Sequence, residues 1–131
     1  FVNMATLATL HVCPSCRVPG STHELTKNRA GFKLFQALLD AFDKCPLKHR
    51  VDIQPTECLS LCPRPCGFSL SSPRAWHYLF GDQDPQNNME DIIVFIRQYL
   101  ESDDGLIPRK QRPKSLQKSI LGRIPPYKTC V

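Results

Sequence analysis

The chain lacks the signals of several large protein classes. The longest apolar run of its C-terminal half is the five residues from Ile92 to Ile96, far too short to span a bilayer, so we expect no membrane segment. No charged and then apolar leader precedes the first predicted strand, and we therefore predict a cytoplasmic protein. The sequence also has no glycine-rich phosphate loop, no pair of carboxylates expected to flank a cleft and no recognisable Ser/His/Asp signature, which leaves hydrolase or kinase chemistry unsupported.

Acidic residues are missing from the end of the chain. Residues 1–104 carry ten Lys/Arg against twelve Asp/Glu, a net charge of −2, so all the excess positive charge follows residue 104. Such a segment can dock an acidic protein or a nucleic acid. It is, however, more apolar than a free basic arm needs, since it contains Ile107, Leu116, Ile120, Leu121 and Ile124. We predict a domain over 1–104 and a basic, proline-containing extension over 105–131 that packs on the domain or docks from it, and we expect no nucleic-acid partner.

Cysteine, by contrast, is abundant. The chain has seven cysteines, five of them in two groups, Cys13-Pro14-Ser15-Cys16 and Cys58-Leu59-Ser60-Leu61-Cys62 with Cys66 just beyond. A disulfide framework is not expected in a reducing compartment, and the odd count would leave one cysteine unpaired. Both zinc sites and four-thiolate iron–sulfur clusters need four soft donors around one small centre. The two groups therefore predict a metal site but leave the metal open.

The apolar pattern predicts six regular elements. A strand over 5–12 stops at the first cysteine group, and a helix with apolar residues from Phe32 to Phe42 ends at Cys45-Pro46. A second strand covers 49–54, and a hairpin joins 67–71 to 75–80. Asn88 is expected to cap a second helix that closes at Asp103-Asp104-Gly105.

This order, β-α-β-β-β-α, predicts an α/β protein with a thioredoxin-like mixed sheet and an extended basic tail. The first β-α-β unit should be a crossover that joins two parallel strands. Because parallel strands end at the same edge of a sheet, Cys13 and Cys58 should lie at one end of the molecule.

Other residues near the cysteine groups have alternative interpretations. Cys66 is a fifth candidate ligand, a spare thiol that exchanges with its neighbours, or a small buried residue at the start of a strand, and the last is favoured. Arg17 and Arg64 either stabilise thiolates or are solvated. Cys45 and Cys130 have no partner at ligand spacing, so both are expected to be structural or incidental. A further group, Trp76, Tyr78 and Phe80, alternates along the predicted strand and either lies near a cofactor or packs in the core.

With the cysteines placed on this order, the chain resembles the thioredoxin-like 2Fe-2S ferredoxins. It is also similar to a bacterial family described only as predicted metal-binding proteins, sometimes found beside cobalamin genes. The shared motifs are Cys13-Pro14-Ser15-Cys16-Arg17, the stretch from Cys58 to Cys66, Trp76 to Gly81, Asp104-Gly105, Ile107-Pro108, Arg112-Pro113 and Arg123-Ile124-Pro125-Pro126. The first resemblance implies that Cys13, Cys16, Cys58 and Cys62 bind a 2Fe-2S cluster. Those ferredoxins space their first two cysteines more widely, so Cys66 is the replacement if Cys16 does not bind.

Three functions follow as hypotheses. The first is a ferredoxin-like carrier of one electron, which is not an enzyme and serves a redox partner that the sequence does not name. The second is a zinc or cobalt binding or delivery protein with the same thiolates. The third is an oxidoreductase in which Cys13 and Cys16 cycle between dithiol and disulfide. A homodimer is compatible with the sequence, although no residue argues for it.

Overall fold

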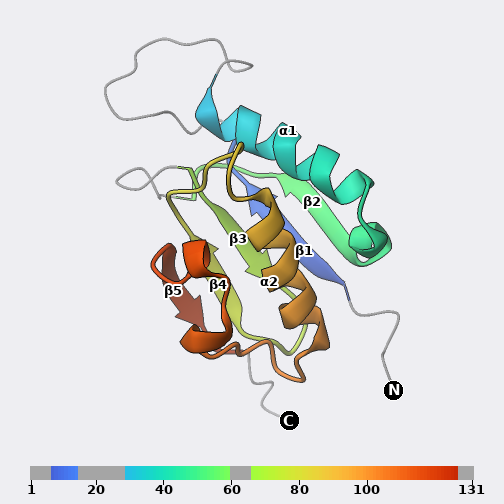
Figure 1. Ribbon diagram of the computed structural model, residues 1–131, viewed down its shortest axis with the longest axis vertical. Coiled ribbons are helices and arrows are strands. Elements are labelled where there is room, and N and C mark those ends of the chain that lie inside the picture. The colour runs from blue at the N-terminus through green and yellow to red at the C-terminus, as the bar shows by residue number, and fades with distance from the viewer. Residues whose placement is uncertain (1–6, 15–28, 60–65, 127–131) are drawn as a thin grey trace.

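A five-stranded mixed sheet forms the centre of the protein in a computed structural model that describes residues 7–14, 29–59 and 66–126 (Figure 1). The strand order is β2-β1-β3-β4-β5, and only the β1 and β2 pair is parallel. The strands are β1 (Ala8–Val12), β2 (Val51–Pro55), β3 (Phe68–Ser71), β4 (His77–Phe80) and β5 (Ile120–Ile124). The helices are α1 (Ala30–Asp43) and α2 (Met89–Glu101), with short 3-10 helices η2 (Pro46–Arg50), η3 (Arg109–Gln111) and η4 (Lys114–Leu116).

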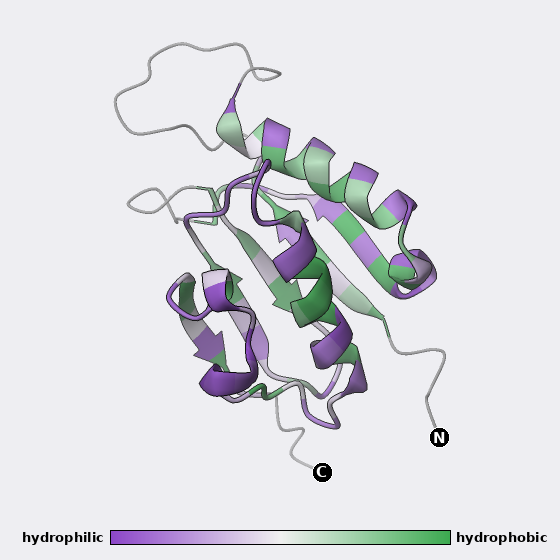
Figure 2. Cartoon of the chain, viewed as in Figure 1, coloured by the Kyte–Doolittle hydropathy of each residue, from purple (hydrophilic) through white to green (hydrophobic). Residues whose placement is uncertain are grey.

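One face of the sheet carries the core. Alternate residues of the inner strands are fully buried, among them Leu10 on β1, Leu70 on β3 and Tyr78 on β4, while the residues between them are only half-buried. The two helices cross the same side of the sheet in Figure 1, and each presents an apolar stripe that includes Leu38 on α1 and Ile96 on α2. Figure 2 shows hydrophobic segments alternating with hydrophilic ones along both helices. The architecture is therefore two layers, with both helices over one face.

The structure confirms the six predicted elements in their predicted order and the parallel pairing of the first two strands. It corrects two details. His49 and Arg50 belong to η2 rather than to β2, because Pro46 starts a 3-10 turn in which Cys45 Sγ accepts a hydrogen bond from the Leu47 N–H. Asn88 stands at the start of α2, but its side chain accepts from the backbone N–H of Asp84 and makes no cap to the helix. No helix in the described ranges is long and apolar enough to cross a bilayer.

The basic extension adds an element that the sequence did not predict. Residues 120–124 form β5, which pairs antiparallel with β4 and completes the sheet. Leu116 is fully buried and Ile107 nearly so, which means that the segment supplies part of the core. Over its described residues, the segment expected to be an extended tail therefore forms the edge strand β5 and two short 3-10 helices.

A buried tyrosine holds the start of the extension. The hydroxyl of Tyr78 donates to the carbonyl of Gly105 at 2.7 Å and accepts from the N–H of Ile107 at 3.0 Å. The ring packs edge-on against Phe95 and Tyr99 of α2. Tyr78 and Phe80 are therefore core residues. Of the two sequence interpretations, a place near a cofactor or packing in the core, the second applies to both.

Gly105 is the tightest point of this arrangement. Its φ of +77° lies in the left-handed region, and a Cβ added there would stand 2.6 Å from Cε1 of Tyr99. Gly122 on β5 offers a matched contrast, because a Cβ added there meets nothing within 4 Å.

We expect Gly105→Ala to lower the free energy of unfolding by more than about 2 kcal/mol, from the strained φ and the overlap with Tyr99. Gly122→Ala should be neutral or stabilise by up to about 1 kcal/mol. Urea denaturation of both variants measures the difference. Equal stabilities would show that residue 105 does not hold the extension in this conformation.

Candidate metal centre

Three cysteines lie at one edge of the sheet because of how β1 pairs. Cys13 follows the last residue of β1, and Val12 is in register with Pro55 at the end of parallel β2 and with Phe68 at the start of antiparallel β3. Cys58 comes three residues after Pro55, and Cys66 comes two residues before Phe68. The structure thus confirms that the ends of the first two strands meet at the same edge, and it adds the start of the third.

Cys13 lies just inside this edge. The ladder between β1 and β2 continues one residue beyond the strands, since the N–H of Thr56 donates to the carbonyl of Val12 at 2.9 Å. This bond holds the segment that leads to Cys58 against the residue before Cys13. Cys13 is 7% exposed, yet it is not a member of the main apolar cluster of the core. The Cys13 side chain is therefore largely shielded from solvent, but it lies outside the apolar cluster of the core.

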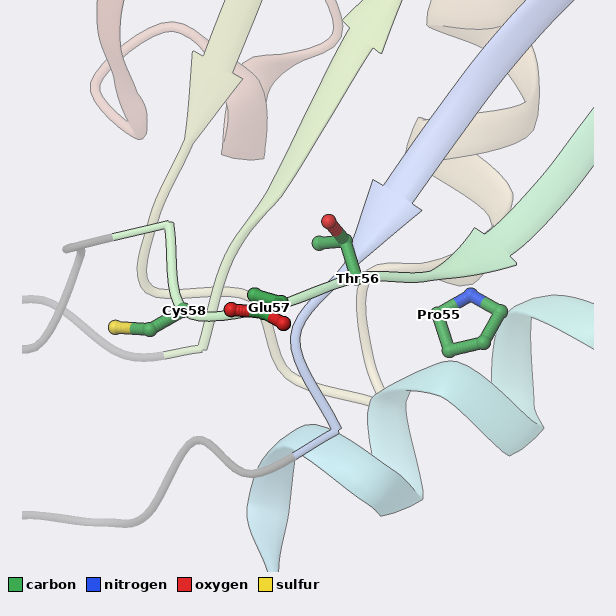
Figure 3. A pocket seen from close by; sticks show the side chains of 4 residues that line it. All are labelled: Pro55, Thr56, Glu57 and Cys58. Carbon is green, nitrogen blue, oxygen red and sulfur yellow. The ribbon is translucent and has the colours of Figure 1, made fainter.

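Cys58 lies on the solvent-exposed side of the same edge of the sheet. It is exposed, and with Pro55, Thr56 and Glu57 it lines an open pocket of about 520 Å³. Figure 3 shows its sulfur pointing away from β1 and β2. A thiol in this position is accessible to a metal ion or to another molecule.

Cys66 has a different environment. It is 4% exposed and belongs to the apolar cluster, and its carbonyl accepts a hydrogen bond from the N–H of Gln83 at 2.9 Å. This packing agrees with the favoured sequence interpretation of Cys66 as a small buried residue at the start of a strand.

Gln83 is a buried polar residue of this edge that the sequence analysis missed. Its side-chain Nε2 donates to the carbonyl of Gly81 at 2.7 Å, and the N–H of Gly81 donates to the carbonyl of Ser119 at 2.9 Å. The residue therefore links Cys66 to the end of β4 and to the start of β5. A glutamine in a polar loop carries no sequence signal for such a role, since only the fold brings the two chain segments together.

The described thiols share an edge but do not converge on one point. In ranges 7–14, 29–59 and 66–126, no group of three Cys, His, Asp or Glu side chains is placed to hold a metal ion. Two of the four implied ligands, Cys16 and Cys62, lie outside these ranges, as do Arg17, Arg64 and Cys130. Cys45 is buried at the start of η2, far along the chain from both groups, and its sulfur caps the turn. The structural role predicted for Cys45 is thereby explained.

The sheet order, the parallel crossover and the two helices on one face define a thioredoxin-like fold. The chain belongs to the family described as "Protein of unknown function (DUF1636)", whose model matches residues 10–126. A search of curated proteins finds no match.

Solved structures share this architecture over nearly the whole chain. A thioredoxin-like 2Fe-2S ferredoxin from Aquifex aeolicus matches with a TM-score of 0.60 and 19% identity, covering 95% of this chain and 100% of that one. The 1.5 Å crystal structure of the wild-type ferredoxin from the same organism matches with a TM-score of 0.57 and 20% identity over 90% of this chain and 99% of that one. At such identities the likeness establishes the fold, and it confirms the thioredoxin-like mixed sheet predicted from the sequence.

The different burial of Cys66 and Cys58 predicts different costs of substitution. In metal-free protein, Cys66→Ser should lower the free energy of unfolding by about 1–3 kcal/mol, because a hydroxyl would enter the apolar cluster. Cys58→Ser should change it by less than about 0.5 kcal/mol, because the side chain is exposed. Thermal and urea denaturation after chelation measure both values. A Cys66 variant as stable as the Cys58 variant would contradict the core placement.

Proposed function

We propose that the protein is a ferredoxin-like iron–sulfur electron carrier, in which Cys13, Cys16, Cys58 and Cys62 bind a 2Fe-2S cluster. The observation that carries this proposal is the edge at which β1 and β2 end together, with Cys13 after one strand and Cys58 after the other. The fold that the chain shares with a 2Fe-2S ferredoxin supports iron–sulfur over zinc.

The described residues fit such a group in their chemistry. Thiolates are the donors that iron–sulfur clusters take, and this edge offers one sheltered sulfur at Cys13 and one exposed sulfur at Cys58. When bound, a 2Fe-2S cluster takes up and releases one electron. The chain then has to hold the thiolates, shield one side of the site and leave the other side open to a redox partner. Those tasks need no enclosed substrate pocket, and the pocket beside Cys58 is open.

The choice of the fourth ligand favours Cys16 over Cys66. Cys66 packs in the apolar cluster, and its backbone carbonyl is held by Gln83, so its present contacts are those of a core residue. For Cys66 to bind, its sulfur would have to leave the apolar cluster. We therefore propose Cys16, three residues after Cys13, as the partner of Cys13.

A dithiol oxidoreductase is less well supported. Activation of Cys13 by a helix dipole needs a helix N-terminus at that thiol. The helix that follows β1 in the described residues, α1, begins at Ala30. The N-terminus of α1 is therefore not at Cys13.

Protein purified without oxygen should be brown and contain iron and acid-labile sulfide, and dithionite should bleach its visible absorption. Absorption spectroscopy with metal and sulfide analysis tests this, and electron paramagnetic resonance of the reduced protein reports the unpaired electron. A colourless protein with stoichiometric zinc would overturn the proposal in favour of zinc binding.

Cysteine variants test the ligand set. Cys13→Ser and Cys58→Ser should each lose most of the iron and the visible absorption, because a hydroxyl is a poor substitute for a thiolate ligand. Cys45→Ser is the matched control, since its sulfur caps η2 and a hydroxyl accepts the same hydrogen bond. Cys66→Ala should keep the 2Fe-2S cluster, although it should lower the free energy of unfolding. Loss of iron in the Cys66 variant but not in Cys16→Ser would assign the fourth ligand to Cys66.

A further inference from the structure

A cluster of three arginines lies away from the cysteine edge. Arg123 is on β5, in register with Tyr78 of β4, so the two side chains share one face of the sheet. Trp76, two residues before Tyr78, is on that face as well, and the guanidinium carbon of Arg123 stands 5.3 Å from the centroid of its ring. Figure 2 shows hydrophilic residues gathered on η3, η4 and the end of β5.

The Tyr78 contacts bring the other two arginines to the same place. Because the Tyr78 hydroxyl holds Ile107, the segment that leads into η3 passes beside this face. Arg112 then turns back, and its Nε donates to the carbonyl of Ile107 at 3.0 Å, which leaves the Nη groups for other partners. Arg109 is exposed on η3, two residues after Ile107. The Arg112 guanidinium thus lies close enough to those of Arg123 and Arg109 to interact with both electrostatically, and Arg123 lies over the Trp76 ring.

No carboxylate neutralises this cluster within the part of the chain that the structure describes. None of the three arginines forms an ion pair with an acidic side chain there. Partial burial lowers the pKa of Arg112; Tyr78 acts in the opposite direction, and the like charges of Arg123 and Arg109 lower the pKa further. Three mutually repelling cations held together by the fold are stabilised by a bound anion.

The tryptophan is held in place independently of the arginines. Its backbone N–H donates to the carbonyl of Asp104 at 2.8 Å, and its carbonyl accepts from the hydroxyl of Tyr99 at 2.6 Å. The backbone that carries the ring is therefore fixed, and the ring itself is partly buried against the core cluster next to the Arg123 guanidinium. A guanidinium presented on such a surface loses less freedom when it binds an anion.

We propose that Arg109, Arg112 and Arg123 form a binding site for the phosphate group of a small phosphorylated molecule. Guanidinium groups bind phosphate oxygens in pairs of parallel hydrogen bonds, and three of them match a doubly charged phosphate monoester better than a singly charged phosphodiester. The site stands at the start of β4, whereas Cys66 lies near Phe80 at its other end through the pairing of Phe80 with Phe68. The proposal therefore stands whether or not the cysteines bind iron.

The arrangement favours a small ligand over a nucleic acid. The three arginines lie near one another, with Arg123 over the Trp76 ring, whereas proteins that follow a nucleic-acid backbone spread their cations along a groove. The test has to separate these two sources of phosphate.

Trp76 supplies the readout, because it is the only tryptophan of the chain. In the purified full-length protein, inorganic phosphate should change the Trp76 fluorescence in a saturable way, while sodium chloride of equal ionic strength should not. Arg109→Gln and Arg123→Gln should each weaken phosphate binding at least about tenfold, the effect of losing a charge-assisted hydrogen bond.

Lys114→Gln is the matched control, since it removes the same charge from the same extension on η4. Its effect on phosphate binding should be less than about twofold, because it removes only a screened surface charge. Arg123→Lys keeps the positive charge but loses the planar guanidinium that can make two parallel hydrogen bonds, so it should also weaken phosphate binding. Circular dichroism and a wild-type melting temperature confirm that each variant is folded.

Three results would overturn the proposal. The first is a fluorescence change that does not saturate with phosphate. The second is a Lys114→Gln variant as weak as Arg109→Gln, which would mean general screening. The third is a single-stranded oligonucleotide that binds more tightly than phosphate at equal phosphate concentration and salt, which would assign the surface to nucleic acid.

Discussion

The rest of the structure depends on the hydrogen bonds that β1 makes on both sides. Parallel pairing with β2 and antiparallel pairing with β3 place the end of β1 between two other chain segments. Cys13, Cys58 and Cys66 share an edge for this reason alone, although more than 50 residues of sequence separate the first from the last. Because pairing with β2 forces a crossover, α1 has to lie on a face of the sheet, and the core forms under it.

The opposite end of the sheet is organised by Tyr78. Its ring fills the core against α2, and its hydroxyl satisfies two backbone groups of the segment that follows α2. A buried hydroxyl with both a donor and an acceptor partner costs little in desolvation, and it fixes the path of the chain. That path leads to β5, which pairs with β4 as the edge strand, and it brings Arg112 next to Ile107 and Arg123 over Trp76. One buried side chain thus accounts for the docking of the extension and for the charge of its surface.

The two ends of the sheet carry side chains of different chemistry. Cysteine thiols, which are soft donors and differ in burial, lie where β1 and β2 end. Arg123, a cation that can bind a hard anion such as phosphate, lies over Trp76 where β4 begins. The strands of the sheet stand between the two places, so each can be altered while the other is kept. A protein that carries electrons at one end would have a separate surface for phosphate at the other.

Local patterns in the sequence by themselves determined the six predicted elements, because apolar spacing around Phe32 to Phe42 or the alternation near Tyr78 reflects which side of an element is buried. The cysteine spacing likewise indicated the candidate site, and the parallel crossover predicted that Cys13 and Cys58 would meet. Only the tertiary structure decided that residues 120–124 form β5, since an edge strand of mixed polarity is stabilised by its pairing with β4 rather than by its own pattern. The tertiary structure also decided the burial of Cys66 with its bond to Gln83, and the proximity of Arg112 to Arg109 and Arg123. Those contacts join residues distant in sequence, and no local pattern records the partner that each side chain meets once the chain has folded.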